Sequence, residues 1–161
     1  MMGIFDIWKR DPDSPKIVAL PPVIYSVGFL VGYACNIWWG LSFGVGKALA
    51  FGWILLLGGG LLAAWAAWRF RRAGTNIHPT HPTTKLVIAG PYLVTRNPMY
   101  LALTVAHIGV AALLDAPVAL LALLVILPTM HWGVVLREEA YLEAKFGEDY
   151  RRYMQATKRY F

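Results

Sequence analysis

Two polar segments carry the residues whose types and spacing could do chemistry. The first is GPYLVTRNPMY, residues 90–100, which places an arginine, an amide, two prolines and two tyrosines directly before a long apolar run. The second begins at residue 137 as REEAYLEAKFGEDYRRY and opens with two adjacent glutamates. A guanidinium can bind a carboxylate through two parallel hydrogen bonds, and a glutamate can bind an ammonium group or ribose hydroxyls. Together the segments predict a site for a zwitterionic ligand with an aromatic head.

The charged members of these segments also have simpler interpretations. Arg96 lies at the start of an apolar run, where it could anchor the chain to lipid headgroups. Glu138 and Glu139 follow the next apolar run and could simply be solvated. Each residue alone therefore leaves the function open, and the argument rests on their combination.

The four histidines of the chain do not form a metal-binding pattern. His78 and His81 flank prolines in a loop, and two histidines without further ligands do not make a metal site, so we expect no metal. His107 and His131 lie within or near apolar runs, where a hydrogen bond in the interior explains them as well as ligand binding does.

The elements that must position the polar segments are membrane-spanning helices. Hydrophobic residues make up 58% of the chain and charged residues only 15%. The uncharged runs 17–39 and 48–68 are each long enough to cross a bilayer. Residues 99–136 carry one acid, Asp115 beside Pro117, which predicts two shorter spans joined by a tight turn. We therefore predict an all-α polytopic membrane protein with about four transmembrane helices in a single domain.

The distribution of basic residues predicts the orientation of these spans. With four spans, the amino-terminal segment, the loop between the second and third spans, and the carboxyl-terminal segment share one side and hold 14 of the 15 lysines and arginines. Lys47 alone lies on the other side. This asymmetry predicts both termini and the site in the cytoplasm, in a bacterial cell at the inner membrane. A basic face beside anionic headgroups also explains the net charge of +6, so we expect no nucleic-acid partner.

The segment after the last span is predicted to be an amphipathic helix lying at the membrane interface, bent at Gly147. Its apolar and aromatic residues recur at helical spacing: Tyr141, Leu142, Phe146, Tyr150, Tyr153 and Met154. The expected organisation is a cytoplasmic segment 1–16, two transmembrane helices within 17–70, and a core 75–161 that carries the site.

The order and spacing of the two segments resemble the isoprenylcysteine carboxyl methyltransferase and phospholipid methyltransferase families of integral membrane methyltransferases. Those families carry G-x-Y-x-x-x-R-H-P-x-Y followed by E-E-x-x-L-x-x-x-F-G-x-x-Y-x-x-Y. The matching residues here are Gly90, Tyr92, Arg96, Pro98 and Tyr100, then Glu138, Glu139, Leu142, Phe146, Gly147, Tyr150 and Tyr153. The resemblance covers roughly residues 75–159, about half of the chain, and His78 is a weaker match to a histidine that precedes the first motif.

The resemblance implies methyl transfer from S-adenosylmethionine, which would enter from the cytoplasm, to a lipophilic or small acceptor that would enter from the bilayer. It implies that Arg96, Asn97 and Glu139 carry the reaction. Its cofactor site would comprise His78, Gly90, Tyr92, Arg96, Asn97, Pro98, Tyr100, Glu138 and Glu139. On this basis we expect Arg96 to bind the cofactor carboxylate, and Glu138 or Glu139 to bind its ammonium group or ribose.

One departure from the family pattern bears on the acceptor. Asn97 stands where the families often have histidine, which removes a titratable group. A carboxylate acceptor needs no base, whereas an amine or thiol would need His78, His131 or solvent to take its proton. The acceptor and the oligomeric state therefore stay open. Two other classes also remain, a non-enzymatic helical membrane adaptor and a nicotinamide-dependent lipid reductase, and cofactor binding would distinguish them.

Overall fold

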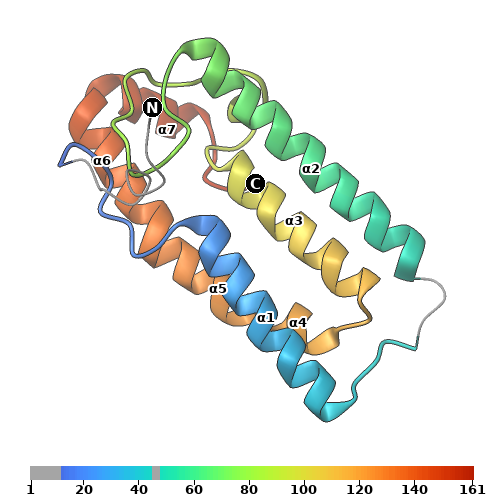
Figure 1. Ribbon diagram of the computed structural model, residues 1–161. Helices are drawn as coiled ribbons and strands as arrows, with labels where there is room; N and C mark the ends of the chain where they lie inside the picture. The colour runs from blue at the N-terminus through green and yellow to red at the C-terminus, as the bar shows by residue number, and fades with distance from the viewer. Residues whose placement is uncertain (1–11, 45–47) are drawn as a thin grey trace, which may run out of the picture.

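The computed structural model describes residues 12–44 and 48–161, and every regular element in these ranges is helical (Figure 1). This confirms the all-α prediction. In chain order the elements are α1 Pro21–Trp39, α2 Ala48–Ala73, the 3-10 helix η2 Gly90–Leu93, α3 Pro98–Leu113, α4 Pro117–Leu121, α5 Leu123–Met130, the π-helical segment η3 His131–Val135, α6 Leu136–Phe146 and α7 Glu148–Ala156.

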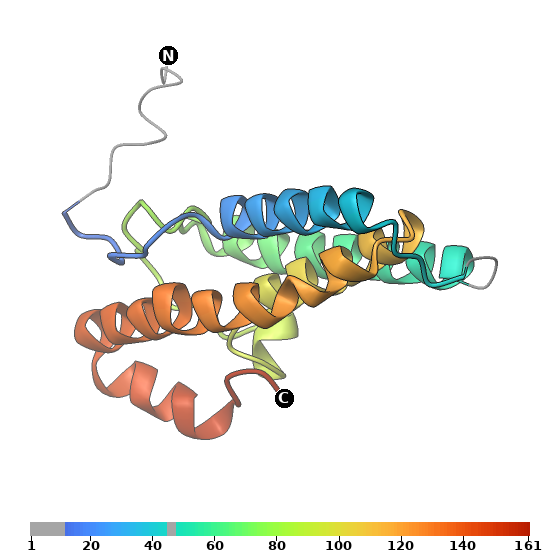
Figure 2. The same cartoon turned by 90° about the horizontal axis from the view of Figure 1, so that it is seen from below.

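Two helices in the described ranges are long and apolar enough to cross a membrane, Leu49–Ala73 and Pro117–Phe146. The second joins α4, α5, η3 and α6 into one continuous rod, which Figure 2 shows from below. Of the other two predicted spans, α3 is apolar but only 16 residues long, and α1 has 19 residues. Large apolar side chains such as Leu61 and Leu124 are 71% and 73% exposed, as expected for surfaces that face lipid.

Small residues allow the helix backbones to approach closely. A Cβ added at Gly59 of α2 would lie 2.8 Å from the carbonyl oxygen of Ala102 in α3, and one at Gly32 of α1 would lie 2.8 Å from Cα of Ala119 in α4. Packing of this kind is typical of helices that associate within lipid.

The predicted tight turn between the last two apolar runs is confirmed. Asp115 adopts a positive φ of 50° between the end of α3 and the start of α4. Its carboxylate accepts a 2.7 Å hydrogen bond from the backbone N–H of Phe43 and another from the hydroxyl of Ser42. The one acid of this apolar stretch therefore fastens the α1–α2 connection to the α3–α4 turn.

The carboxyl-terminal segment differs from the prediction of a helix at the membrane interface. Gly147, with φ of 54°, ends α6 and reverses the chain, so that α7 folds back beneath α6 and the C-terminus lies near the start of α3 (Figures 1 and 2). The aromatic face of α7 is buried within the protein: Tyr150 and Tyr153 are 1% and 5% exposed and pack with Tyr92. This internal packing accounts for the amphipathic pattern without a membrane surface.

Candidate active site

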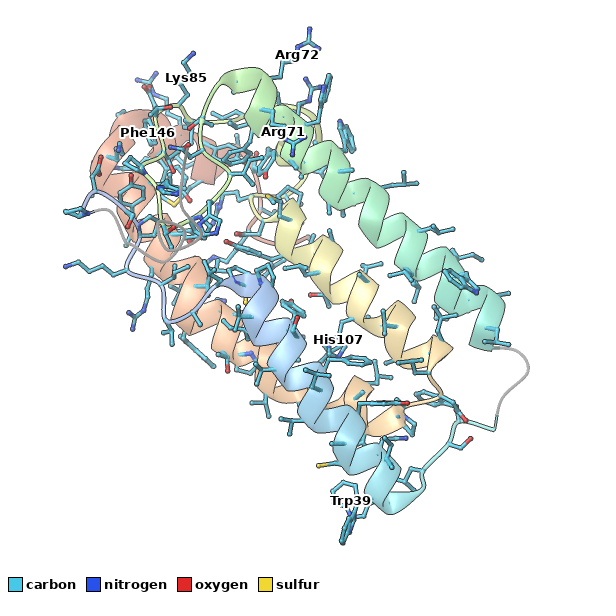
Figure 3. The ribbon with its side chains drawn as sticks, viewed as in Figure 1. Trp39, Arg71, Arg72, Lys85, His107 and Phe146 are labelled. Atoms are coloured by element: carbon cyan, nitrogen blue, oxygen red, sulfur yellow. The ribbon has the colours of Figure 1, made fainter. Side chains whose placement is uncertain are left out.

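A pocket opens at the end of the helices where polar side chains gather, the end marked by Lys85 and Phe146 in Figure 3. Its walls are the loop that follows α2, the start of α3, one face of α6, and α7. Eight of the nine predicted site residues line it, namely His78, Tyr92, Arg96, Asn97, Pro98, Tyr100, Glu138 and Glu139. The two motifs therefore meet in one cavity, although 38 residues separate Tyr100 from Glu138 along the chain.

Gly90 is the exception, and its assignment to the cofactor site stays a prediction. It packs against α2, where an added Cβ would lie 2.5 Å from Nε of Arg69, and it does not line the pocket. Its φ of 63° lies in the left-handed region that favours glycine. The residue therefore shapes the turn into η2, the helix that carries Tyr92.

A cluster of three charges lies at the pocket, and two of its members, Arg96 and Glu139, line it. Arg96 donates to Oε1 of Glu139 from Nε at 3.2 Å and from Nη2 at 2.9 Å. Arg159 donates to the same carboxylate from Nε at 3.0 and 3.1 Å and from Nη2 at 2.7 Å. The side chains of Arg96 and Glu139 are only 9% and 10% exposed. Charge-assisted hydrogen bonds between such buried side chains fix the geometry of the wall.

The guanidinium of Arg96 is almost fully used inside the protein. Its Nη1 donates to the backbone carbonyls of Met154 and Thr157, each at 2.9 Å. With the two bonds to Glu139, four of its five N–H groups have partners. The two-pronged bond expected between Arg96 and a ligand carboxylate is made instead to Glu139, because α6 brings that carboxylate against it. Arg96 thus offers a ligand a fixed positive charge and one N–H.

Glu138, unlike Arg96, has few hydrogen-bond partners inside the described part of the protein. Its Oε1 accepts a 2.6 Å hydrogen bond from the hydroxyl of Tyr100, and no cation of the described chain pairs with it. Both residues line the pocket. A carboxylate held in a largely buried site without a counter-charge favours a cationic ligand group, because its desolvation is otherwise uncompensated. Of the two glutamates left open by the sequence, Glu138 is therefore the one available to an ammonium group.

The carboxyl-terminal tail is hydrogen-bonded to residues 95–97, beside the pocket. The backbone carbonyl of Arg159 accepts from Nδ2 of Asn97 at 3.0 Å and from the hydroxyl of Thr95 at 2.9 Å. The backbone N–H of Arg96 donates to the carbonyl of Lys158 at 2.9 Å. Sequence reasoning missed this tail because its contacts to residues 95–97 are mostly through backbone atoms. The last four residues, KRYF, indicate only that the carboxyl-terminal end of the sequence is basic.

The lining also includes aromatic and imidazole groups, together with the polar side chains of Asn76, Thr83 and Lys85. His78 Nδ1 lies 2.7 Å from the hydroxyl oxygen of Thr80, and burial, followed by the nearby His81, lowers the pKa of His78 below its ordinary value. Burial also raises the pKa of Tyr92 well above its ordinary value, so it is a neutral phenol. Tyr150 also lines the pocket and is 1% exposed.

The two histidines in the apolar runs lie outside the pocket. His107 is buried in the helix bundle, as labelled in Figure 3, with Nε2 2.8 Å from the carbonyl oxygen of Ala119. His131 opens the π-helical segment, and its Nδ1 lies 2.8 Å from the hydroxyl of Tyr160. Both make hydrogen bonds within the protein, which is one of the two interpretations that the sequence left open.

Fold and site together define an all-helical membrane protein with a polar pocket at one end, built from two motifs of the second half of the chain. The family model for phospholipid methyltransferase matches residues 47–149, and the chain belongs to that family. An uncharacterized protein of Haemophilus influenzae (strain Rd) is 36% identical over 62 residues, which is 38% of this chain and 98% of that protein. The family match confirms the resemblance and supports methyl transfer in general.

Proposed function

We propose that the protein is an integral membrane methyltransferase that uses S-adenosylmethionine and methylates a lipophilic or small acceptor. The observation that carries the proposal is the charge pattern of the pocket: Glu138 has no cation partner in the described chain, and it stands next in sequence to Glu139, which two arginines bind. A ligand that bears both an ammonium group and a carboxylate complements such a wall.

The residues present fit this cofactor. Glu138, with Tyr100 holding its carboxylate, would bind the ammonium group, and the spare N–H and positive charge of Arg96 would face the carboxylate. Apolar side chains line the same pocket and suit the adenosine end; they are Phe70, Leu86, Val87, Met99 and Leu142. The cofactor, once bound, supplies an electrophilic methyl group on a sulfonium.

The protein would then contribute by positioning the cofactor and by excluding water from the pocket. A wall held by five hydrogen bonds to Glu139 would hold a bound cofactor in one orientation, and methyl transfer would then be an effectively intramolecular step. Asn97, fixed through Nδ2 to the tail, provides no titratable group beside the reacting atoms. A carboxylate acceptor would need none, and an amine or thiol would give its proton to His78 or to water.

The membrane arrangement belongs to the same proposal. Helices α1, α2, α3 and the rod from α4 to α6 would make four crossings, with the short α3 sitting in a locally thinned bilayer. The pocket and both termini would lie on the cytoplasmic side, as the basic residues predict. The cofactor would then enter from water, and a lipophilic acceptor would arrive from the bilayer.

Calorimetric titration of the detergent-purified protein with S-adenosylhomocysteine tests the proposal, with nicotinamide adenine dinucleotide phosphate as the control ligand. We expect binding of the first ligand alone. The variant Glu138→Gln keeps an acceptor for Tyr100 but removes the charge, and it should weaken binding roughly tenfold to a hundredfold, the value of a hydrogen bond to a charged group. Folded protein that binds neither ligand would instead support a helical membrane adaptor.

A further inference from the structure

Arg159 is the member of the charge cluster that no motif of the sequence includes. It donates three hydrogen bonds to the carboxylate of Glu139, at 2.7, 3.0 and 3.1 Å. Its side chain is 36% exposed, compared with 9% for Arg96, so it closes the cluster from the solvent side. Arg96 already gives Glu139 one counter-charge, and a second arginine is therefore more than neutralisation requires.

The excess charge has a consequence for the pocket. Two arginines and one glutamate carry a net charge of +1, while Arg96 and Glu139 alone would be neutral. Charges a few ångströms apart interact strongly where water is excluded. With Arg159 present, the Arg96–Glu139 part of the wall is positive beside the negative Glu138, and without Arg159 this part would be neutral, leaving the exposed Lys85 as the remaining cation of the lining.

The backbone of the tail is held independently of this side chain. The carbonyl of Arg159 accepts hydrogen bonds from Asn97 and Thr95, and a parallel bridge pairs Thr95 with Lys158. Substitution of the Arg159 side chain therefore leaves the tail attached to the start of α3, and its electrostatic effect can be measured separately from the loss of the tail.

We propose that Arg159 is a positioning residue for the cofactor: it keeps the Arg96–Glu139 wall net positive, so that the wall receives the carboxylate of the amino-acid end. The inference rests on the proposed function and adds to it a residue from the tail. It predicts that Arg159 acts on ligands that carry this carboxylate and not on the adenosine end.

Two ligands and two matched variants test the role. Arg159→Gln and Lys158→Gln each remove one positive charge from neighbouring tail positions, but Lys158 is exposed and contacts the site only through its backbone. We expect Arg159→Gln to weaken binding of S-adenosylhomocysteine roughly tenfold, as expected for one charge at short range. Binding of 5′-methylthioadenosine, which lacks the amino-acid end, should change less than about twofold. Lys158→Gln should change neither.

Two further variants separate charge from shape. Arg159→Lys keeps the charge but loses the guanidinium fork, and it should retain most of the affinity for S-adenosylhomocysteine. The double variant Glu139→Gln with Arg159→Gln restores a net charge of +1, and it should bind S-adenosylhomocysteine more tightly than Arg159→Gln alone. Thermal melting of each variant identifies any that do not fold, in which case Arg159→Lys carries the test.

The outcomes are distinct. Equal loss of both ligands in Arg159→Gln, unchanged affinity for S-adenosylhomocysteine, or an Arg159→Lys variant as weak as Arg159→Gln would each overturn the charge role. Wild-type protein that is folded but binds neither ligand would instead overturn the proposed function itself.

Discussion

The substitution Glu139→Gln should destabilise the protein more than any other conservative change on α6. Glu139 accepts five hydrogen bonds from two arginines, and three of them reach Oε1 while two reach Oε2. Glutamine keeps one oxygen only. Whichever way the amide is turned, its NH2 group faces guanidinium donors, and two positive charges are left side by side.

The magnitude follows from the burial of the cluster. Removal of one partner from a buried ion pair costs about 3–5 kcal/mol, because the remaining charge is desolvated without compensation. Arg159 is 36% exposed and can turn toward water, which places the expected cost near the lower end, about 3 kcal/mol. For a chain of this size that loss lowers the melting temperature by about 6–12 °C.

Thermal unfolding in detergent, followed by circular dichroism, measures the loss, and Glu143→Gln is the matched control. Glu143 lies one turn further along α6 and pairs with Arg151 at 3.3 Å, but the two side chains are 46% and 52% exposed. An exposed pair contributes about 0–1 kcal/mol, so the control should melt close to wild type. If Glu139→Gln melts no lower than Glu143→Gln, the buried cluster does not stabilise the fold and the reasoning is refuted.

Three other predictions concern packing, a buried hydroxyl and a titrating histidine. Gly59→Ala should cost about 1–3 kcal/mol in thermal melts because its Cβ would meet the backbone of α3, whereas Gly58→Ala, with open space around it, should be neutral; equal effects would contradict close α2–α3 packing. Tyr153→Phe should cost about 1–3 kcal/mol because it removes the 2.7 Å bond to the carbonyl of Tyr92, and Tyr150→Phe should leave the melting temperature unchanged; a stable Tyr153→Phe would mean that water satisfies that carbonyl. Because the pKa of His78 is lowered, the folded state binds fewer protons than the unfolded chain once the pH falls through the ordinary value for histidine. The free energy of unfolding should therefore fall on acidification from about pH 7.5 to 5, and His78→Gln should make it depend less on pH. If the pH dependence is unchanged in His78→Gln, the lowered pKa of His78 does not cause it.

The sequence predicted the helices and most of the pocket because both depend on local patterns. Uncharged runs fix the helices of the bundle, and Asp115 beside Pro117 marks the turn that the structure has there. The two motifs flank one apolar hairpin, so their meeting at one end follows from connectivity. The same local logic does not reveal whether a motif glycine such as Gly90 serves a ligand or a backbone turn.

The partners of the charged residues could not be predicted in this way. Arg159 lies 20 residues from Glu139 in the chain, and it reaches that carboxylate only because Gly147 reverses the chain after α6. Likewise, the aromatic spacing of α7 predicts one apolar face, but it does not specify whether lipid or protein covers that face. Tertiary contacts made α7 part of the pocket wall, with Tyr150 and Tyr153 against Tyr92.

Polar residues at the boundary of a membrane cost free energy unless something pairs with them. In this site most polar groups pair within the protein, and one is left for a ligand. Arg96, Glu139 and Arg159 pair with one another and with the backbone of the tail, so these three need no ligand to be stable. Glu138 alone keeps a carboxylate that only a phenol hydroxyl contacts in the described chain. Selectivity for a cationic ligand group should therefore depend on Glu138, while the rigidity of the site depends on the cluster. A variant of the cluster should lower stability and affinity together, whereas Glu138→Gln should lower affinity alone.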